Sequence, residues 1–108
     1  PGKKSKNIKI EDIGKIRIDF DHYLAYDRDG NQIDMTFKEF EILKFFQQNK
    51  EKTVSRDELL DKVWGYEIYP TSRTVDNHIV KLRKKIEQDP EHPKHILTVY
   101  GIGYKFIE

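Results

Sequence analysis

The sequence contains no cysteine and no long apolar run. The absence of cysteine excludes disulfides, thiol catalysis and cysteine-based zinc sites, and it is compatible with a reducing compartment. No segment approaches the about 20 apolar residues that cross a bilayer, and no short apolar segment follows an N-terminal charge cluster as in a signal peptide. The sequence therefore predicts a cytoplasmic protein that does not enter a membrane.

Net charge is also nearly absent, since 20 Lys and Arg residues are set against 19 Asp and Glu residues. Affinity for a polyanion must therefore come from local clustering of charge. Residues 73–85 provide such a cluster, with five cationic side chains and one acidic side chain. Residues 51–67 have the opposite balance, with five acidic and three basic side chains. Charge is thus segregated along the chain.

The length of 108 residues corresponds to one domain with a modest core. Residues 1–7 are basic, small and without periodicity, so we interpret them as a linker or a remnant of cloning and exclude them from the fold. The predicted domain covers residues 8–108.

A basic amphipathic helix is predicted from Ser72 to Gln88. Its apolar positions recur at helical spacing and form one stripe, which predicts that this side is buried. The opposite side is cationic and rich in hydrogen-bond donors. The apolar stripe consists of Val75, Ile79, Leu82 and Ile86, and the outward side carries Arg73, Asn77, Val80, Lys81 and Lys84, with Arg83 and Lys85 on the flanks. A helix that enters a DNA major groove reads bases with its N-terminal residues and meets phosphates with its basic groups. Surface helices also carry such charges merely to stay solvated.

Short alternations of apolar and polar residues between Ile8 and Met35 predict several half-buried strands in an antiparallel sheet. The expected strands include residues 9–10, 15–20, 23–26 and 33–35. Capping boxes then predict two helices, one from Thr36 to about Asn49 and a shorter one from Ser55 to a stop at Gly65. The order of elements predicts an α+β fold.

The C-terminal residues 96–107 predict two strands that turn at Gly101 to Gly103. This hairpin can lie beside the basic helix and reach an adjacent groove, because Tyr100, Tyr104 and Lys105 offer donors near the turn. The two glycines either allow a close approach to phosphate or serve only the turn.

Catalytic and metal-binding arrangements are not found. The Asp27 to Asn31 turn lacks the glutamate that a calcium loop requires, because Lys38 occupies that position. His92 and His95 lack further ligands nearby. We expect neither an enzyme nor a metal or other cofactor.

Four ordered motifs resemble the OmpR/PhoB-type winged-helix effector domain of bacterial two-component response regulators. They are residues 36–43 (TFKEFEIL), 54–65 (VSRDELLDKVWG), 73–86 (RTVDNHIVKLRKKI) and 101–104 (GIGY). The resemblance covers about residues 8–106. It implies a winged helix-turn-helix with an N-terminal four-stranded antiparallel sheet, three helices and a C-terminal β-hairpin wing.

The resemblance also implies function. The basic helix would be the recognition helix for double-stranded DNA, and an upstream receiver domain with a phosphorylated aspartate would be absent from this chain. Members tend to bind tandem direct repeats, and the loop of residues 66–71 matches one that contacts the sigma or alpha subunit of RNA polymerase, with Glu67, Ile68 and Tyr69 as candidates. The expected DNA-binding residues are Trp64, Arg73, Thr74, Asn77, His78, Val80, Lys81, Arg83, Lys84, Thr98, Tyr100, Gly101, Gly103 and Tyr104.

Two positions depart from the family pattern. Val80 and Tyr100 stand where well-known members carry arginine, so one expected groove contact is apolar, suited to a thymine methyl group, and the wing contact is aromatic. An alternative hypothesis is a winged helix that docks on RNA polymerase without reading DNA. The leading hypothesis is sequence-specific DNA binding for transcriptional regulation.

Overall fold

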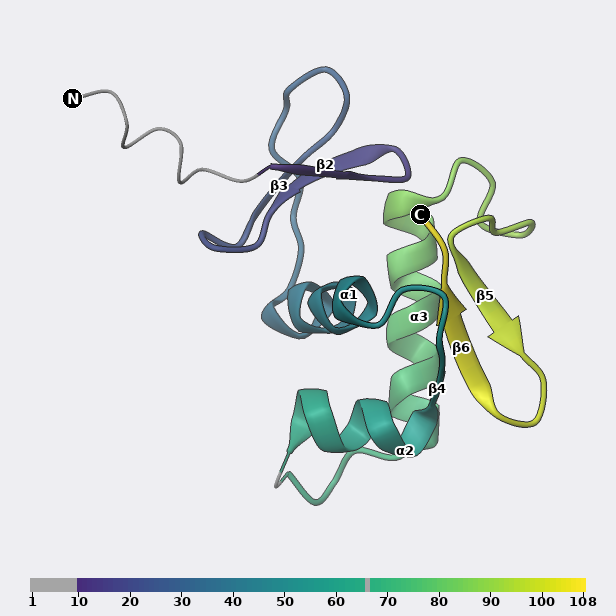
Figure 1. Cartoon of the computed structure of the whole chain (residues 1–108). Coiled ribbons are helices and arrows are strands. Elements are labelled where there is room, and N and C mark those ends of the chain that lie inside the picture. Colours follow the sequence, from purple (N-terminus) through teal and green to yellow (C-terminus); the bar gives the residue numbers. More distant parts are fainter. Residues whose placement is uncertain (1–9, 66) are drawn as a thin grey trace.

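The computed structural model describes residues 10–65 and 67–108. The expected linker at 1–7, Lys9 of the expected 9–10 strand, and Tyr66 of the expected polymerase loop lie outside the described residues. Within the described part, the order is three strands, helix α1, a fourth strand, three further helical segments and a C-terminal hairpin (Figure 1).

Among the described residues, the N-terminal sheet has three strands, where the sequence predicts four. Its strands are β1 (Glu11–Ile13), β2 (Ile16–Asp19) and β3 (Leu24–Tyr26), paired antiparallel in that order. The expected strand at 33–35 reduces to a bridge between Tyr26 and Gln32 and one hydrogen bond from the Ile33 amide to Ala25.

Helix α1 (Phe37–Gln48) begins as the sequence predicts. The Thr36 hydroxyl accepts from the Glu39 amide at 3.2 Å, and the Glu39 carboxylate accepts from the Thr36 amide at 2.9 Å. The same carboxylate is almost completely buried and pairs with Lys85 at 2.7 Å. Since Lys85 belongs to the basic helix, this buried ion pair joins the two helices, and Lys85 does not project freely from the flank.

Strand β4 (Thr53–Ser55) was not predicted. It pairs with the C-terminal strand β6 (Gly103–Phe106), which also pairs with β5 (Ile96–Val99), giving a second three-stranded sheet of order β4-β6-β5. Ser55 ends β4 and also caps helix α2 (Arg56–Leu59), with Glu58 completing the capping box. Helix α2 continues as the π-helical turn η2 (Leu60–Trp64) and stops at Gly65, which has a φ of 61°.

Helix α3 (Ser72–Ile86) runs through the centre of the molecule, with α1 and α2 on one side and the β5–β6 hairpin on the other (Figure 1). The predicted apolar stripe is fully buried, with Val75, Ile79, Leu82 and Ile86 each at 0% exposure. These side chains join Phe46, Phe106 and the inward residues of both sheets in a single core. Burial of one side of α3 therefore fixes which side faces solvent.

Candidate nucleic-acid interface

The solvent-facing side of α3 is the one that the sequence predicts. Arg73, Asn77, Val80, Lys81 and Lys84 are all exposed, and Val80 has 51% of its surface accessible. Among the described residues, no carboxylate pairs with Arg73, Lys81 or Lys84. Their exposure shows that neither sheet covers this ridge. The α3 ridge, which we define by these five residues, is therefore a convex cationic surface free to meet an anionic partner.

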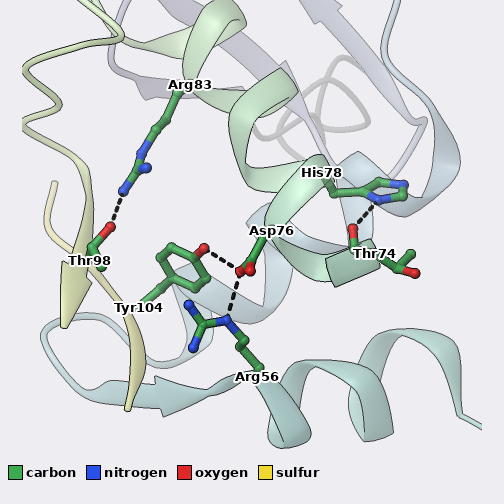
Figure 2. Close-up of polar contacts among 7 residues, drawn as sticks. All are labelled: Arg56, Thr74, Asp76, His78, Arg83, Thr98 and Tyr104. Carbon is green, nitrogen blue, oxygen red and sulfur yellow. Dashed lines mark hydrogen bonds and ion pairs between the residues drawn. The ribbon is translucent and has the colours of Figure 1, made fainter. Parts of the chain in front are cut away.

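The N-terminal end of α3 is more enclosed. Thr71 is the N-cap, and its amide donates to the Thr74 hydroxyl at 3.0 Å. The His78 ring lies 2.9 Å from the Thr74 carbonyl through Nδ1 and packs edge-on against Trp64, with centroids 5.1 Å apart (Figure 2). Trp64 is only 6% exposed. Thr74 and His78 thus reach the surface at one margin of the ridge, while Trp64 belongs mainly to the core.

Three of the residues that the sequence predicts to bind DNA do not project into solvent. They pack against one another. Arg83 donates to the Ile96 carbonyl at 2.7 Å and to the Thr98 hydroxyl at 3.0 Å, and its guanidinium lies 5.6 Å from the Tyr104 ring centroid (Figure 2). Tyr104 is 5% exposed and its hydroxyl donates to Asp76 at 2.6 Å. The structure places Arg83, Thr98 and Tyr104 between α3 and the hairpin.

The sequence did not predict two residues that contact Tyr104, namely Arg56 and Asp76. Arg56 of α2 donates to Asp76 at 2.7 Å and lies 5.4 Å from the Tyr104 ring centroid. The available signal was Asp76 itself, the one acidic residue within a cationic stretch of helix. An acid in that setting is typical of a specific internal partner, but the partner cannot be chosen from sequence because the contact spans 20 residues.

This environment changes the pKa values of Asp76 and Tyr104. Partial burial raises the pKa of Asp76, but the hydrogen bonds from Tyr104 and Arg56 together outweigh it and bring the pKa below its ordinary 3.8. Burial raises the pKa of Tyr104 from 10.0, and the hydrogen bond to Asp76 raises it further, to about 12. Near neutral pH, Asp76 is therefore ionised and Tyr104 is a neutral donor.

We expect Tyr104 to ionise near pH 12 in the folded protein, well above its ordinary pKa of 10.0. Because folding favours the neutral phenol, its stabilisation is complete below pH 10.0 and is lost as the pH rises toward about 12. Absorbance of the phenolate during alkaline titration measures this directly. The Tyr104→Phe variant should lack the last-ionising component, and loss of a component near pH 10 instead would contradict the assignment.

The tip of the hairpin is exposed and largely apolar. Tyr100 is 90% exposed and Ile102 is 55% exposed, on either side of Gly101, whose φ of 82° permits the turn. Gly103 has a different role, because its backbone presses against Val54 and Ser55 of β4 and a side chain there would collide with them. Of the two glycines, only Gly101 is open to a ligand.

The loop before α3 presents a second exposed surface. Ile68 and Tyr69 are 82% and 89% exposed, and Glu67 pairs with Lys38 of α1 at 2.7 Å. A hollow of about 550 Å³ lies here, lined by Glu67, Ile68, Tyr69, Pro70 and Thr74. The two large apolar side chains do not fold back onto the core.

Two features are absent from the described residues 10–65 and 67–108. In them, no group of three or more His, Cys, Asp or Glu side chains is arranged to hold a metal ion. None of the helices in that part of the chain combines the length and the apolar character needed to span a membrane.

A three-helix core, an exposed basic third helix and a C-terminal hairpin beside it define a winged-helix DNA-binding domain. Comparison with known proteins agrees. Residues 30–106 match the family model described as "Transcriptional regulatory protein, C terminal". The chain belongs to this family, which comprises the OmpR/PhoB-type effector domains of response regulators and is not an enzyme family.

Individual relatives support the assignment. The alkaline phosphatase synthesis transcriptional regulatory protein PhoP of Bacillus subtilis is 40% identical over 111 residues, covering 100% of this chain and 46% of that protein. The response regulator DrrB of Thermotoga maritima, an OmpR/PhoB homologue, has a TM-score of 0.79 at 36% identity, covering 97% of this chain and 47% of that chain.

A third relative was solved with DNA. The Klebsiella pneumoniae RstA DNA-binding domain, in complex with the RstA box, has a TM-score of 0.73 at 27% identity over 92% of this chain and 97% of that chain. These relatives favour DNA binding over the alternative of a docking module that does not read DNA. The chain spans about half the length of the full-length regulators it matches.

Proposed function

We propose that the α3 ridge enters the major groove of duplex DNA at regulated promoters and that the β5–β6 wing lies against the adjacent minor groove. The observation that carries this proposal is the ridge itself, where Arg73, Lys81 and Lys84 are exposed directly opposite the buried stripe. A rigid helix with one face locked in a core presents its other face at a fixed angle, as groove recognition requires.

Within this interface the residues take different roles. Arg73, Lys81 and Lys84 neutralise phosphates or meet base edges, and Thr74, His78 and the margin of Trp64 contact the backbone at the N-terminal end of α3. Tyr100 and Gly101 approach the minor groove. For Arg83, Thr98, Gly103 and Tyr104, the internal contacts support a role within the protein in place of direct contact with DNA.

Selection of bound sites from a random duplex pool tests the proposal. We expect enrichment of one defined motif, and in two tandem copies about 10 to 10.5 base pairs apart centre to centre, because successive domains then occupy the same side of the duplex. Recovery of no motif, with binding that depends on salt but not on sequence, would remove sequence-specific recognition from the proposal.

Asn77 and Val80 are expected to set the sequence preference. An asparagine side chain can bond adenine through two atoms, and an apolar side chain can contact a thymine methyl group. Repeating the selection with Asn77→Ala and with Val80→Ser should relax or change one base pair each, worth about 1 to 3 kcal/mol of discrimination. An unchanged motif would remove the substituted residue from base readout. The salt dependence should stay as in the original protein, since neither residue carries charge.

The domain is proposed to act within a longer response regulator. Full-length relatives are about twice as long as this chain, which supports an upstream receiver domain whose phosphorylation controls DNA binding. A two-component regulator of this kind works in the cytoplasm, and the lack of cysteine in the sequence agrees with a reducing compartment.

We also propose that Glu67, Ile68 and Tyr69 contact the sigma or alpha subunit of RNA polymerase, because two large apolar side chains are exposed together beside the hollow. An Ile68→Ala/Tyr69→Ala variant should keep its affinity for the selected duplex and lose about tenfold in activated transcription in a reconstituted assay, as removal of interface anchors does. Full activation by this variant would contradict the contact.

A further inference from the structure

The hairpin is attached to α3 at both ends of the helix. Near the C-terminal end, Arg83 and Glu87 lie one turn apart and bind the two sides of a single residue. Arg83 donates to the Ile96 carbonyl at 2.7 Å, and the Ile96 amide donates to Glu87 at 2.8 Å. Glu87 is 1% exposed and also accepts from the amides of Lys94 and His95, each at 2.9 Å. The start of β5 is thus fixed to α3.

The second attachment lies toward the N-terminal end of α3. There, Tyr104 of β6 donates to Asp76, which also receives Arg56 of α2 (Figure 2). Tyr104 pairs across the hairpin with Thr98, the residue to which Arg83 donates. The two attachments therefore meet on one cross-strand pair of the wing, and side chains from α2 and α3 converge on Tyr104.

We infer that Arg83, Asp76 and Tyr104 are positioning residues that set the angle of the wing against α3 and so determine the spacing at which ridge and wing tip meet DNA. This inference rests on the proposed function. Helix and wing must reach adjacent grooves together, so an ordered wing saves the cost of fixing it on binding. Arg83 would act through the wing and not by neutralising a phosphate.

The inference separates two possible roles of Arg83 by measurement. A phosphate contact contributes about 0.9 to the slope of log affinity against log salt, whereas a positioning residue contributes nothing to that slope. A positioning residue affects only duplexes that the wing can reach. A duplex shortened on the side that the wing protects, identified by hydroxyl-radical footprinting, therefore isolates binding by the α3 ridge alone.

We expect Arg83→Met and Tyr104→Phe to weaken binding of the selected full-site duplex by about tenfold, since each breaks a hydrogen bond that involves a charged group. On the shortened duplex, both variants should bind as tightly as the original protein, with the same salt slope. The wing-tip substitution Tyr100→Ala should weaken binding of the full-site duplex when it is made in the original protein. Made in either variant, it should have little additional effect, because the three residues act through one element.

Matched controls exist elsewhere in the chain. Arg28 donates to the Gly14 carbonyl at 2.8 Å, and the Tyr23 hydroxyl donates to Glu41 at 3.0 Å, and neither hydrogen bond involves a residue of α3 or of the wing. Arg28→Met and Tyr23→Phe should leave binding of both duplexes unchanged. Amide NMR spectra establish whether each variant is folded. If Arg83→Met does not fold, Tyr104→Phe, which keeps the aromatic ring, provides the test alone.

Three results would overturn the inference. A salt slope lower by about one unit for Arg83→Met on the shortened duplex would make Arg83 a phosphate contact. Full affinity of both variants for the full site would remove any role in positioning. If Tyr100→Ala weakened binding as much in the two variants as in the original protein, the wing tip would act independently of Arg83 and Tyr104. Failure of the original protein to bind any selected duplex would instead overturn the proposed function.

Discussion

The Lys81→Glu/Lys84→Glu variant is expected to bind duplex DNA at least about 100-fold more weakly than the original protein at physiological salt. Each substitution removes a cation and places a carboxylate near a phosphate, and a like-charge contact of this kind costs several kcal/mol of binding free energy. A tenfold change in the dissociation constant corresponds to about 1.4 kcal/mol. Both lysines are exposed on the α3 ridge, so the change should not disturb the core. The slope of log affinity against log salt should fall by about 1.8 for two lost phosphate contacts.

A matched control keeps the same change in net charge at another surface. Lys44 and Lys62 are exposed beside a hollow between α1 and η2, away from the ridge. Lys44→Glu/Lys62→Glu should bind nearly as tightly as the original protein, because exposed charges beyond the Debye length of about 8 Å are largely screened. Fluorescence anisotropy across a salt series measures both variants. Equal loss in the two variants would mean that binding depends on total charge and not on the ridge.

The second large effect concerns the fold. Gly103→Ala is expected to lower the free energy of unfolding by about 3 kcal/mol, the upper range for forcing extra atoms into a packed site. The added methyl group would meet the Val54 carbonyl oxygen and come within 2.8 Å of Ser55 Cα, both of which are backbone. Backbone cannot rotate away as a side chain can, so the pairing of β4 with β6 must open.

Gly101 provides the comparison. Its φ is 82°, and nothing lies within 4 Å of the position of an added side-chain carbon. Asparagine tolerates this backbone conformation, so Gly101→Asn should cost less than about 1 kcal/mol. Urea unfolding followed by circular dichroism measures both variants. Equal stability of the two would show that Gly103 serves only the turn and does not allow β4 to approach.

Much of the fold follows from local patterns. The capping boxes at Thr36 and Ser55 form as predicted, and the stripe from Val75 to Ile86 is buried. The hairpin also turns where Gly101 predicts. These features succeed because capping, periodicity and turn chemistry involve residues within a few positions of each other. Local patterns do not predict the pairing of β4 with β6, because the two strands are separated by about half of the chain.

The candidate site divides along the same line. Helical periodicity was enough to predict which face of α3 is exposed, and hence the cationic ridge with Arg73, Lys81 and Lys84. It could not reveal that Arg83, at the edge of that face, is turned toward the wing, because the carbonyl and hydroxyl it binds lie 13 and 15 residues away. The sequence likewise predicts that Tyr104 is a surface donor, whereas in the structure its hydroxyl donates to Asp76 in the interior.

The sequence by itself determined which face of the basic helix meets a polyanion, because that depends on spacing along the chain, and its four motifs carried the resemblance to response regulators that implies the class of domain. Only the tertiary structure decided which cations remain free and which hold the wing. A side chain at the boundary of a helix face can turn either way, and the choice depends on the hydrogen-bond partners that folding brings beside it.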